Sequence, residues 1–140
     1  MAILDKLFGG KGYTRPLDKT RKIIDRFTTA TIMGVDREDI GRYPHKQRKV
    51  MAFHFGAIEY LANEYGLNET ETLGLFVIFL DKYFNLPVSE TGSISQLLEG
   101  FRSRADEHRY LEAGLEVFRR WHLENDRRAP LQLGEMLQRS

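Results

Sequence analysis

A chain of 140 residues is close to the most common domain size and can bury one hydrophobic core without disulfides or metals. It contains no cysteine, which excludes a disulfide framework, a thiolate zinc site and a cysteine nucleophile. The net charge is only +1, and a hydrophobic content of 41% is too high for a disordered chain.

The small net charge hides an uneven distribution along the chain. Residues 1–50 hold 12 basic and 6 acidic side chains, residues 51–100 hold 1 and 7, and residues 101–140 hold 8 and 7. The differences are +6, −6 and +1. The simplest interpretation is that the basic first part folds against the acidic middle and neutralises it. The alternative is a basic face that binds a partner.

The chain begins with a short amphipathic pattern. Ile3, Leu4, Leu7 and Phe8 have helical spacing and are followed by a glycine-rich stretch, so residues 1–12 are predicted to be a tag and a tether. A helix this short needs a surface to fold on, so we expect the tag to be poorly ordered in the monomer or packed against a neighbouring chain, with a membrane interface as the minor alternative. Residues 13–140 are predicted to form a single helical domain. The pattern is too short for a signal peptide, so we expect a cytoplasmic protein.

The next elements follow from apolar periodicity. Pro16 suits the first position of a helix, whose inward face consists of Thr20, Ile23, Ile24, Phe27 and Thr31. Residues 34–44 have no apolar period and predict a loop. A second helix is predicted over about residues 45–65, and Gly66 stands where a left-handed cap would end it.

The rest of the chain is also helical in pattern. Asn68 and Glu71 form a capping box that begins a third helix, and its apolar run over 73–80 suggests that this is the central buried helix. Residues 94–126 fit one long helix or two broken near Ser103, and Pro130 begins a short final helix. We therefore predict an all-α fold, an irregular bundle or array of five to six helices with a central apolar helix.

Three of the four histidines fall on apolar helix faces. His54 lies in the middle of the second helix, and His108 and His122 lie at the two ends of one apolar seam. The simpler interpretation is packing, because one histidine per helix lacks the paired spacing of a ligand motif. The alternative is that His54, with His108 or His122, ligates haem or a metal ion.

A basic run precedes and opens the second helix, where the helix dipole disfavours cations by roughly 0.3–1 kcal/mol each. Internal pairing with Asp36, Glu38 or Asp39 would resolve this conflict, and we favour it. The other resolution is a site for an anionic ligand, such as a phosphate or lipid head group, or for the acidic surface of a protein. The third helix is almost uncharged, so we do not expect sequence-specific DNA binding. The run consists of Arg42, His45, Lys46, Arg48 and Lys49.

The sequence lacks a glycine-rich phosphate loop, a nucleophile elbow and the common metalloprotease motif. We therefore expect a non-catalytic protein, without a cofactor, that acts as an adaptor or regulator by binding a protein partner or itself, most simply as a homodimer. Trp121 widens an apolar helix face and is assigned, with the apolar residues of the tag, to the partner surface. The alternative function is a small-molecule, haem or metal binder that uses the histidines.

Overall fold

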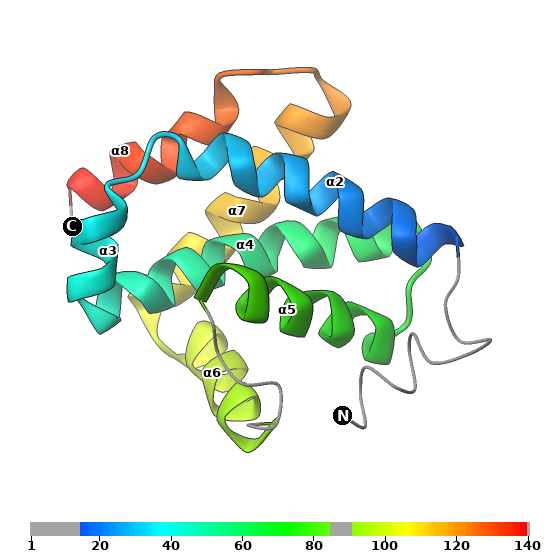
Figure 1. The fold of residues 1–140 in the computed structure, drawn as a ribbon, viewed down its shortest axis with the longest axis horizontal. Coiled ribbons are helices and arrows are strands. Elements are labelled where there is room, and N and C mark those ends of the chain that lie inside the picture. Colours follow the sequence, from blue (N-terminus) through cyan, green and yellow to red (C-terminus); the bar gives the residue numbers. More distant parts are fainter. Residues whose placement is uncertain (1–14, 85–90, 140) are drawn as a thin grey trace.

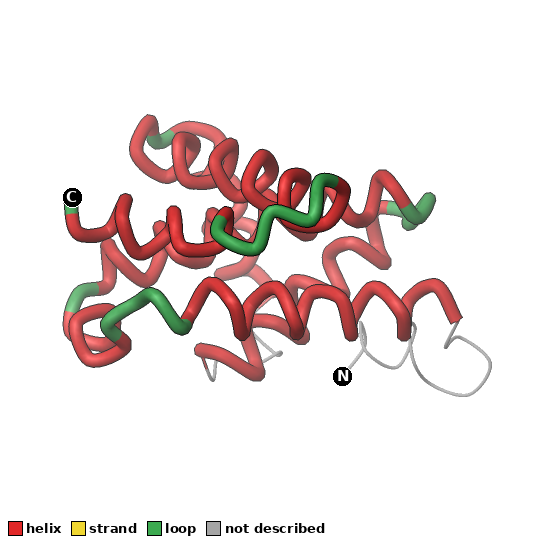
Figure 2. The backbone as a smooth tube through the Cα atoms, turned by 90° about the horizontal axis from the view of Figure 1, so that it is seen from above, coloured by secondary structure: helices red, strands yellow, loops and turns green. Residues whose placement is uncertain are grey.

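The computed structural model describes residues 15–84 and 91–139, and within these ranges every regular element is a helix. The all-α class is thereby confirmed, and short loops join most of the helices (Figure 2). Residues 1–12, predicted as tag and tether, lie outside the described residues. The elements are α2 (Arg15–Ile32), α3 (Arg37–Arg42), α4 (Pro44–Glu64), α5 (Glu69–Phe84), α6 (Thr91–Ser103), α7 (Ala105–Leu123), a 3-10 turn (Ala129–Leu131) and α8 (Gln132–Gln138).

Helix α4 is the central apolar helix of the bundle. It contacts each of the other six described α-helices, and α2, α5 and α7 surround it in Figure 1. Every residue from Met51 to Ile58 is buried. Our assignment of the central position to the run over 73–80 was wrong, because that run belongs to α5, which packs at the side of α4. Leu73 and Ile78 of α5 are only half-buried.

Helices α4 and α7 cross with their backbones in contact. A Cβ atom added at Gly114 of α7 would lie 1.7 Å from the carbonyl oxygen of Phe53, and one at Gly56 of α4 would lie 2.0 Å from that of Leu111. No larger residue fits at either position without moving a helix. The two glycines therefore set how closely α7 approaches α4.

Several local predictions are confirmed. The predicted inward face of α2 is buried from Thr20 to Thr31, and Gly66 has a left-handed φ of 68°. The capping box that begins α5 is formed: the backbone N–H of Glu71 donates to Asn68 Oδ1 over 2.8 Å, and that of Asn68 donates to Glu71 Oε1 over 2.9 Å. These signals depend on residues that are near in sequence, which is why the sequence alone predicts them.

One segment differs from the prediction, and the structure settles a choice that the sequence left open in another. The predicted loop over 34–44 contains α3, whose first turn is capped because the Asp36 carboxylate accepts hydrogen bonds from the N–H groups of Glu38 and Asp39. Only Ile40 of α3 is buried, and one apolar residue creates no helical period. The open choice over 94–126 is settled as two helices, because Arg104 has extended backbone geometry between α6 and α7.

Candidate functional site

The predicted basic run lies at one end of the bundle, around the first turns of α4. Arg42 is the last residue of α3, Tyr43 is the N-cap of α4 without a side-chain hydrogen bond, and Pro44 takes the first helical position. Arg42 and His45 are exposed, whereas Lys46, Arg48 and Lys49 are half-buried. The rotation of α4 directs Lys46 away from the face that carries His45, Arg48 and Lys49, so the run does not form one continuous patch.

Lys46 takes part in the internal pairing that the sequence suggested. Its Nζ donates a hydrogen bond to Oδ2 of Asp39 on α3, and this bond raises the pKa of Lys46 above its usual value. Asp39 thus offsets a cation at the unfavourable end of α4. Lys46 is therefore a residue that joins α3 to α4, and it is not free to hold a ligand.

Arg48 instead reaches a carboxylate from a distant part of the chain. Its Nε lies 3.4 Å from Oε2 of Glu107, and Nη1 of Arg104 lies 3.8 Å from the same oxygen. Glu107 is only 5% exposed. Both distances exceed those of strong charge-assisted hydrogen bonds, so the two guanidinium groups keep most of their donors for other partners. Among the described residues, the second carboxylate oxygen of Glu107 has no hydrogen-bond partner.

These groups line a cavity of about 440 Å³ between the beginnings of α4 and α7. His45, Arg48 and Lys49 reach it from α4, and Arg104 reaches it from the junction of α6 and α7. Lys49 is further held by the ring of Tyr110, with 5.6 Å from its Nζ to the ring centroid. We call this hollow the basic cavity; it is lined by His45, Arg48, Lys49, Arg104, Ala105, Asp106 and Glu107.

The N-terminus of α7 adds hydrogen-bond donors to the basic cavity. Its N-cap, Arg104, makes no side-chain capping bond, and Ala105 and Asp106 in the first turn line the cavity. The first N–H groups of a helix have no partner within the helix and carry the positive end of its dipole. Three permanent cations and these donors face Asp106 and Glu107, which leaves the cavity positive overall.

The described residues show no direct ion pairing of the kind that we favoured for the uneven charge of the chain. Among the described residues, no ion pair joins a base of residues 1–50 to an acid of residues 51–100. The pair between Lys82 and Asp25, at 3.2 Å, instead joins a base of residues 51–100 to an acid of residues 1–50. Of the bases in residues 17–50, some pair locally, as Lys46 does, Arg48 lies near Glu107, Lys49 packs on the ring of Tyr110, and others are exposed to solvent.

His54 has the environment of a packed core residue. It is fully buried beside Phe27, Phe53 and Phe79. Its Nδ1 donates to the carbonyl oxygen of Val50 over 2.9 Å, and its Nε2 lies 2.6 Å from Oγ1 of Thr31. Burial lowers the pKa of His54 to about 4, so the ring is neutral at pH 7 and both nitrogens are occupied.

The other two candidate histidines lie on α7 and do not form a site with His54. His108 contacts Glu112 through Nε2 at 2.7 Å, and His122 stacks on Phe118 with 5.2 Å between the ring centroids. Burial lowers the pKa of His122. Among the described residues, no cluster of three or more histidine or acidic side chains has a geometry suited to a metal ion.

Trp121 is the one residue of the predicted partner surface that lies among the described residues. Ile3, Leu4, Leu7 and Phe8 lie outside the described residues. Trp121 is half-buried, and its ring packs on Phe27 and Phe118 at centroid distances of 5.3 and 5.7 Å. In this position it covers the core of its own chain.

Two residues of the basic cavity had no signal in the sequence. Arg104 and Glu107 stand in a charged stretch like many others, and Glu107 lies 59 residues from Arg48. Only the crossing of α4 and α7 brings them to the basic run. The signal that could have drawn attention to this crossing is the pair of helical glycines, because glycine inside a helix commonly marks close packing.

No known protein family, curated protein or solved structure shows detectable similarity to the chain. None of the described helices is long and apolar enough to cross a membrane. The functional argument therefore depends on the geometry of the chain itself.

Proposed function

We propose that this is a non-catalytic adaptor or regulatory protein that binds an acidic segment of a protein partner in the basic cavity. The observation that carries this proposal is the convergence of Arg48, Lys49 and Arg104 on one hollow at the uncapped N-terminus of α7. Carboxylates are favourable ligands for such a set, because guanidinium groups bind them with two hydrogen bonds and the helix dipole favours negative charge.

The role of Glu107 in this proposal is to position the cations. Its buried carboxylate draws Arg48 and Arg104 together from two elements, although like charges repel. It also prevents a strong excess of positive charge, so we expect moderate affinity that depends on salt. A partner held in this way would associate and dissociate readily, as suits an adaptor.

A protein partner fits better than a small free anion because of where the donors lie. Arg104, Ala105 and Asp106 are exposed, so a ligand group can enter while attached to a large molecule. His45 is also exposed and lines the cavity from α4, so it can contact the flank of an acidic segment. A small enclosed anion would instead call for buried donors on all sides.

The test is binding of a glutamate-rich peptide, measured by calorimetry on the full chain at low and high salt. We expect one saturable site and loss of binding near 1 M salt, where the Debye length is about 3 Å. The double variant Lys49→Gln, Arg104→Gln should bind the peptide about tenfold more weakly, because each cation contributes charge-assisted hydrogen bonds.

The matched control is the double variant Lys22→Gln, Arg26→Gln, which removes two exposed cations from the outer face of α2. Its affinity for the peptide should equal that of the wild type. Equal weakening by both variants would mean that the peptide responds only to overall charge and would contradict the proposal. Inorganic phosphate that displaces the peptide at similar concentrations would also contradict it, because the cavity would then bind a small anion.

A further inference from the structure

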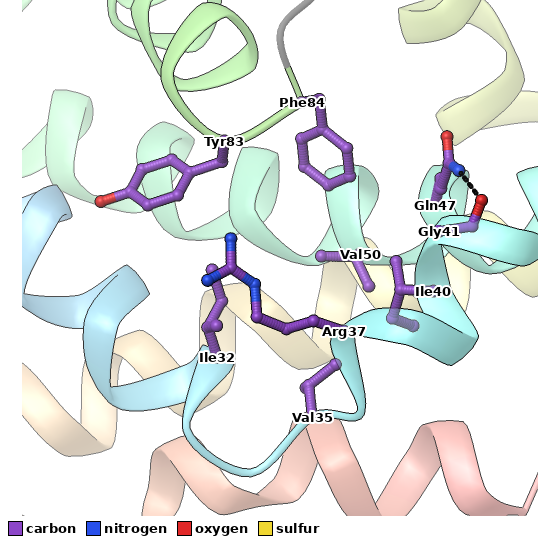
Figure 3. Close-up of a pocket in the computed structure, with 9 residues that line it drawn as sticks. All are labelled: Ile32, Val35, Arg37, Ile40, Gly41, Gln47, Val50, Tyr83 and Phe84. Carbon is purple, nitrogen blue, oxygen red and sulfur yellow. Dashed lines mark hydrogen bonds between the residues drawn. The ribbon is translucent and has the colours of Figure 1, made fainter.

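A second hollow lies on another side of the first turns of α4, between α3 and the end of α5. It has a volume of about 300 Å³ and apolar walls formed by side chains such as Ile40, Val50 and Phe84. Figure 3 shows the ring of Phe84 pointing toward Val50, and Gln47 turned aside to donate to the carbonyl oxygen of Gly41. We call this hollow the apolar cavity.

Among the residues that the structure describes, a single charged side chain borders the apolar cavity. Arg37 extends from α3 so that its guanidinium group lies between Ile32 and Tyr83 (Figure 3). Arg37 is exposed, and its side chain forms no ion pair or hydrogen bond with any described residue. A neighbouring hollow of about 480 Å³ shares Arg37 and Tyr83 and adds Met33. The guanidinium group of Arg37 therefore lies at the edge of two neighbouring hollows.

The chemistry of this arrangement specifies an amphipathic anion. Apolar walls favour an aliphatic chain, whose entry removes exposed hydrocarbon from water. A guanidinium at the mouth favours a planar carboxylate, which it binds with two parallel hydrogen bonds. The volume is at the lower end of ligand cavities in proteins, so the chain must be short.

We propose that the apolar cavity binds an aliphatic carboxylate of medium chain length, with its carboxylate on Arg37 and its chain between Ile40, Val50 and Phe84. This site is separate from the basic cavity, since no residue lines both. Each proposal can therefore fail without the other. The ligand would be a small molecule that accompanies or regulates the adaptor role.

The test compares octanoate with octan-1-ol by calorimetry on the full chain, at concentrations below those at which octanoate forms micelles. We expect octanoate to bind at one saturable site and more tightly than the alcohol. Arg37→Gln should weaken octanoate binding about tenfold, because it removes charge-assisted hydrogen bonds, and should leave octan-1-ol binding nearly unchanged. Arg42→Gln, on the same short helix but outside the cavity, should bind both probes as the wild type does.

A second variant tests the position of the aliphatic chain. Val35 is half-buried at the cavity wall, and Val35→Trp should fill the hollow and abolish binding of both probes while circular dichroism shows an unchanged helix content. Equal affinities for the acid and the alcohol, retention of binding by Val35→Trp, or absence of saturable binding would each overturn the proposal. Tighter binding of an apolar dipeptide with a free carboxyl terminus would also overturn it, because the ligand would then be a peptide end.

Discussion

At the residue scale, His54 shows how an imidazole is accommodated in an apolar core. A neutral ring with its proton on Nδ1 donates to the carbonyl oxygen of Val50, so Nε2 must accept from the hydroxyl of Thr31. That hydroxyl has a second acceptor in reach, the carbonyl oxygen of Thr28 at 2.9 Å. Both ring nitrogens of the histidine therefore have hydrogen-bond partners while the ring is neutral.

Replacement of His54 by leucine should be tolerated at pH 7. The hydroxyl of Thr31 can turn to Thr28, and the Val50 carbonyl keeps its bond to the helix backbone, so no buried group loses its only partner. The lost hydrogen bonds cost about 0.5–1.5 kcal/mol each, and the added apolar surface offsets part of this. Urea denaturation of His54→Leu at pH 7 should give an unfolding free energy within about 1 kcal/mol of the wild type. A much larger loss would mean that the histidine has a role besides packing.

The same residue should make stability depend on pH. Burial lowers the pKa of His54 from 6.5 to about 4, so between these values the unfolded chain binds a proton that the folded chain does not. The contribution of neutral His54 to stability is therefore fully present above pH 6.5. As the pH is lowered toward 4, the free energy of unfolding falls by about 3 kcal/mol for a pKa shift of this size.

The measurement is the unfolding free energy of the wild type and of His54→Leu at pH 7 and pH 4. The wild type should lose about 3 kcal/mol more than the variant, since other titrating groups are common to both. His122→Gln should reduce the loss by less, because His122 is only half-buried. Parallel losses in the wild type and His54→Leu would show that the buried imidazole is not the source.

At the element scale, the contact between α4 and α7 decides the fold. Gly114→Ala places a methyl group where Phe53 O already lies, so the helices must separate. Helix propensity alone would favour alanine by about 1 kcal/mol, but overpacking in a rigid contact commonly costs about 1–3 kcal/mol or more. We expect Gly114→Ala to lower the unfolding free energy by about 2 kcal/mol or more in urea denaturation.

Gly41→Ala is the control for this prediction. Gly41 also lies in a helix, α3, but a Cβ there meets nothing within 4 Å. The substitution should raise the unfolding free energy by about 0.4–1 kcal/mol, because alanine restricts the unfolded chain. If both variants gained stability, α4 and α7 would not be in backbone contact.

The sequence predicted elements better than their arrangement. Caps and periodic faces are local, so α2, α4 and α5 could be placed within a few residues. An apolar run indicates burial but does not say which helix lies in the centre, and α5 was preferred over α4 for that reason. Helix α3 was missed because its only buried residue is Ile40 and its capping residue, Asp36, looked like part of an acidic loop.

At the scale of the whole molecule, the first turns of α4 separate two hollows of different chemistry. Val50 and Gln47 face the apolar cavity, whereas His45, Arg48 and Lys49 face the basic cavity. The basic run predicted from the sequence includes Arg48 and Lys49 of the basic cavity. It does not indicate the buried carboxylate of Glu107 or the N-terminus of α7. These come from α7, and only the tertiary fold brings α7 to α4.

The central claim is that an acidic partner binds at the basic cavity, and amide chemical shifts of the full chain test it most directly. During titration with the glutamate-rich peptide, the largest shifts should occur at Lys49, Ala105 and Asp106 and should disappear in high salt. The outer face of α2 carries exposed cations too, at Lys19, Lys22 and Arg26, and none of these lines the basic cavity. Shifts that follow α2 and leave the beginning of α7 unchanged would contradict the claim.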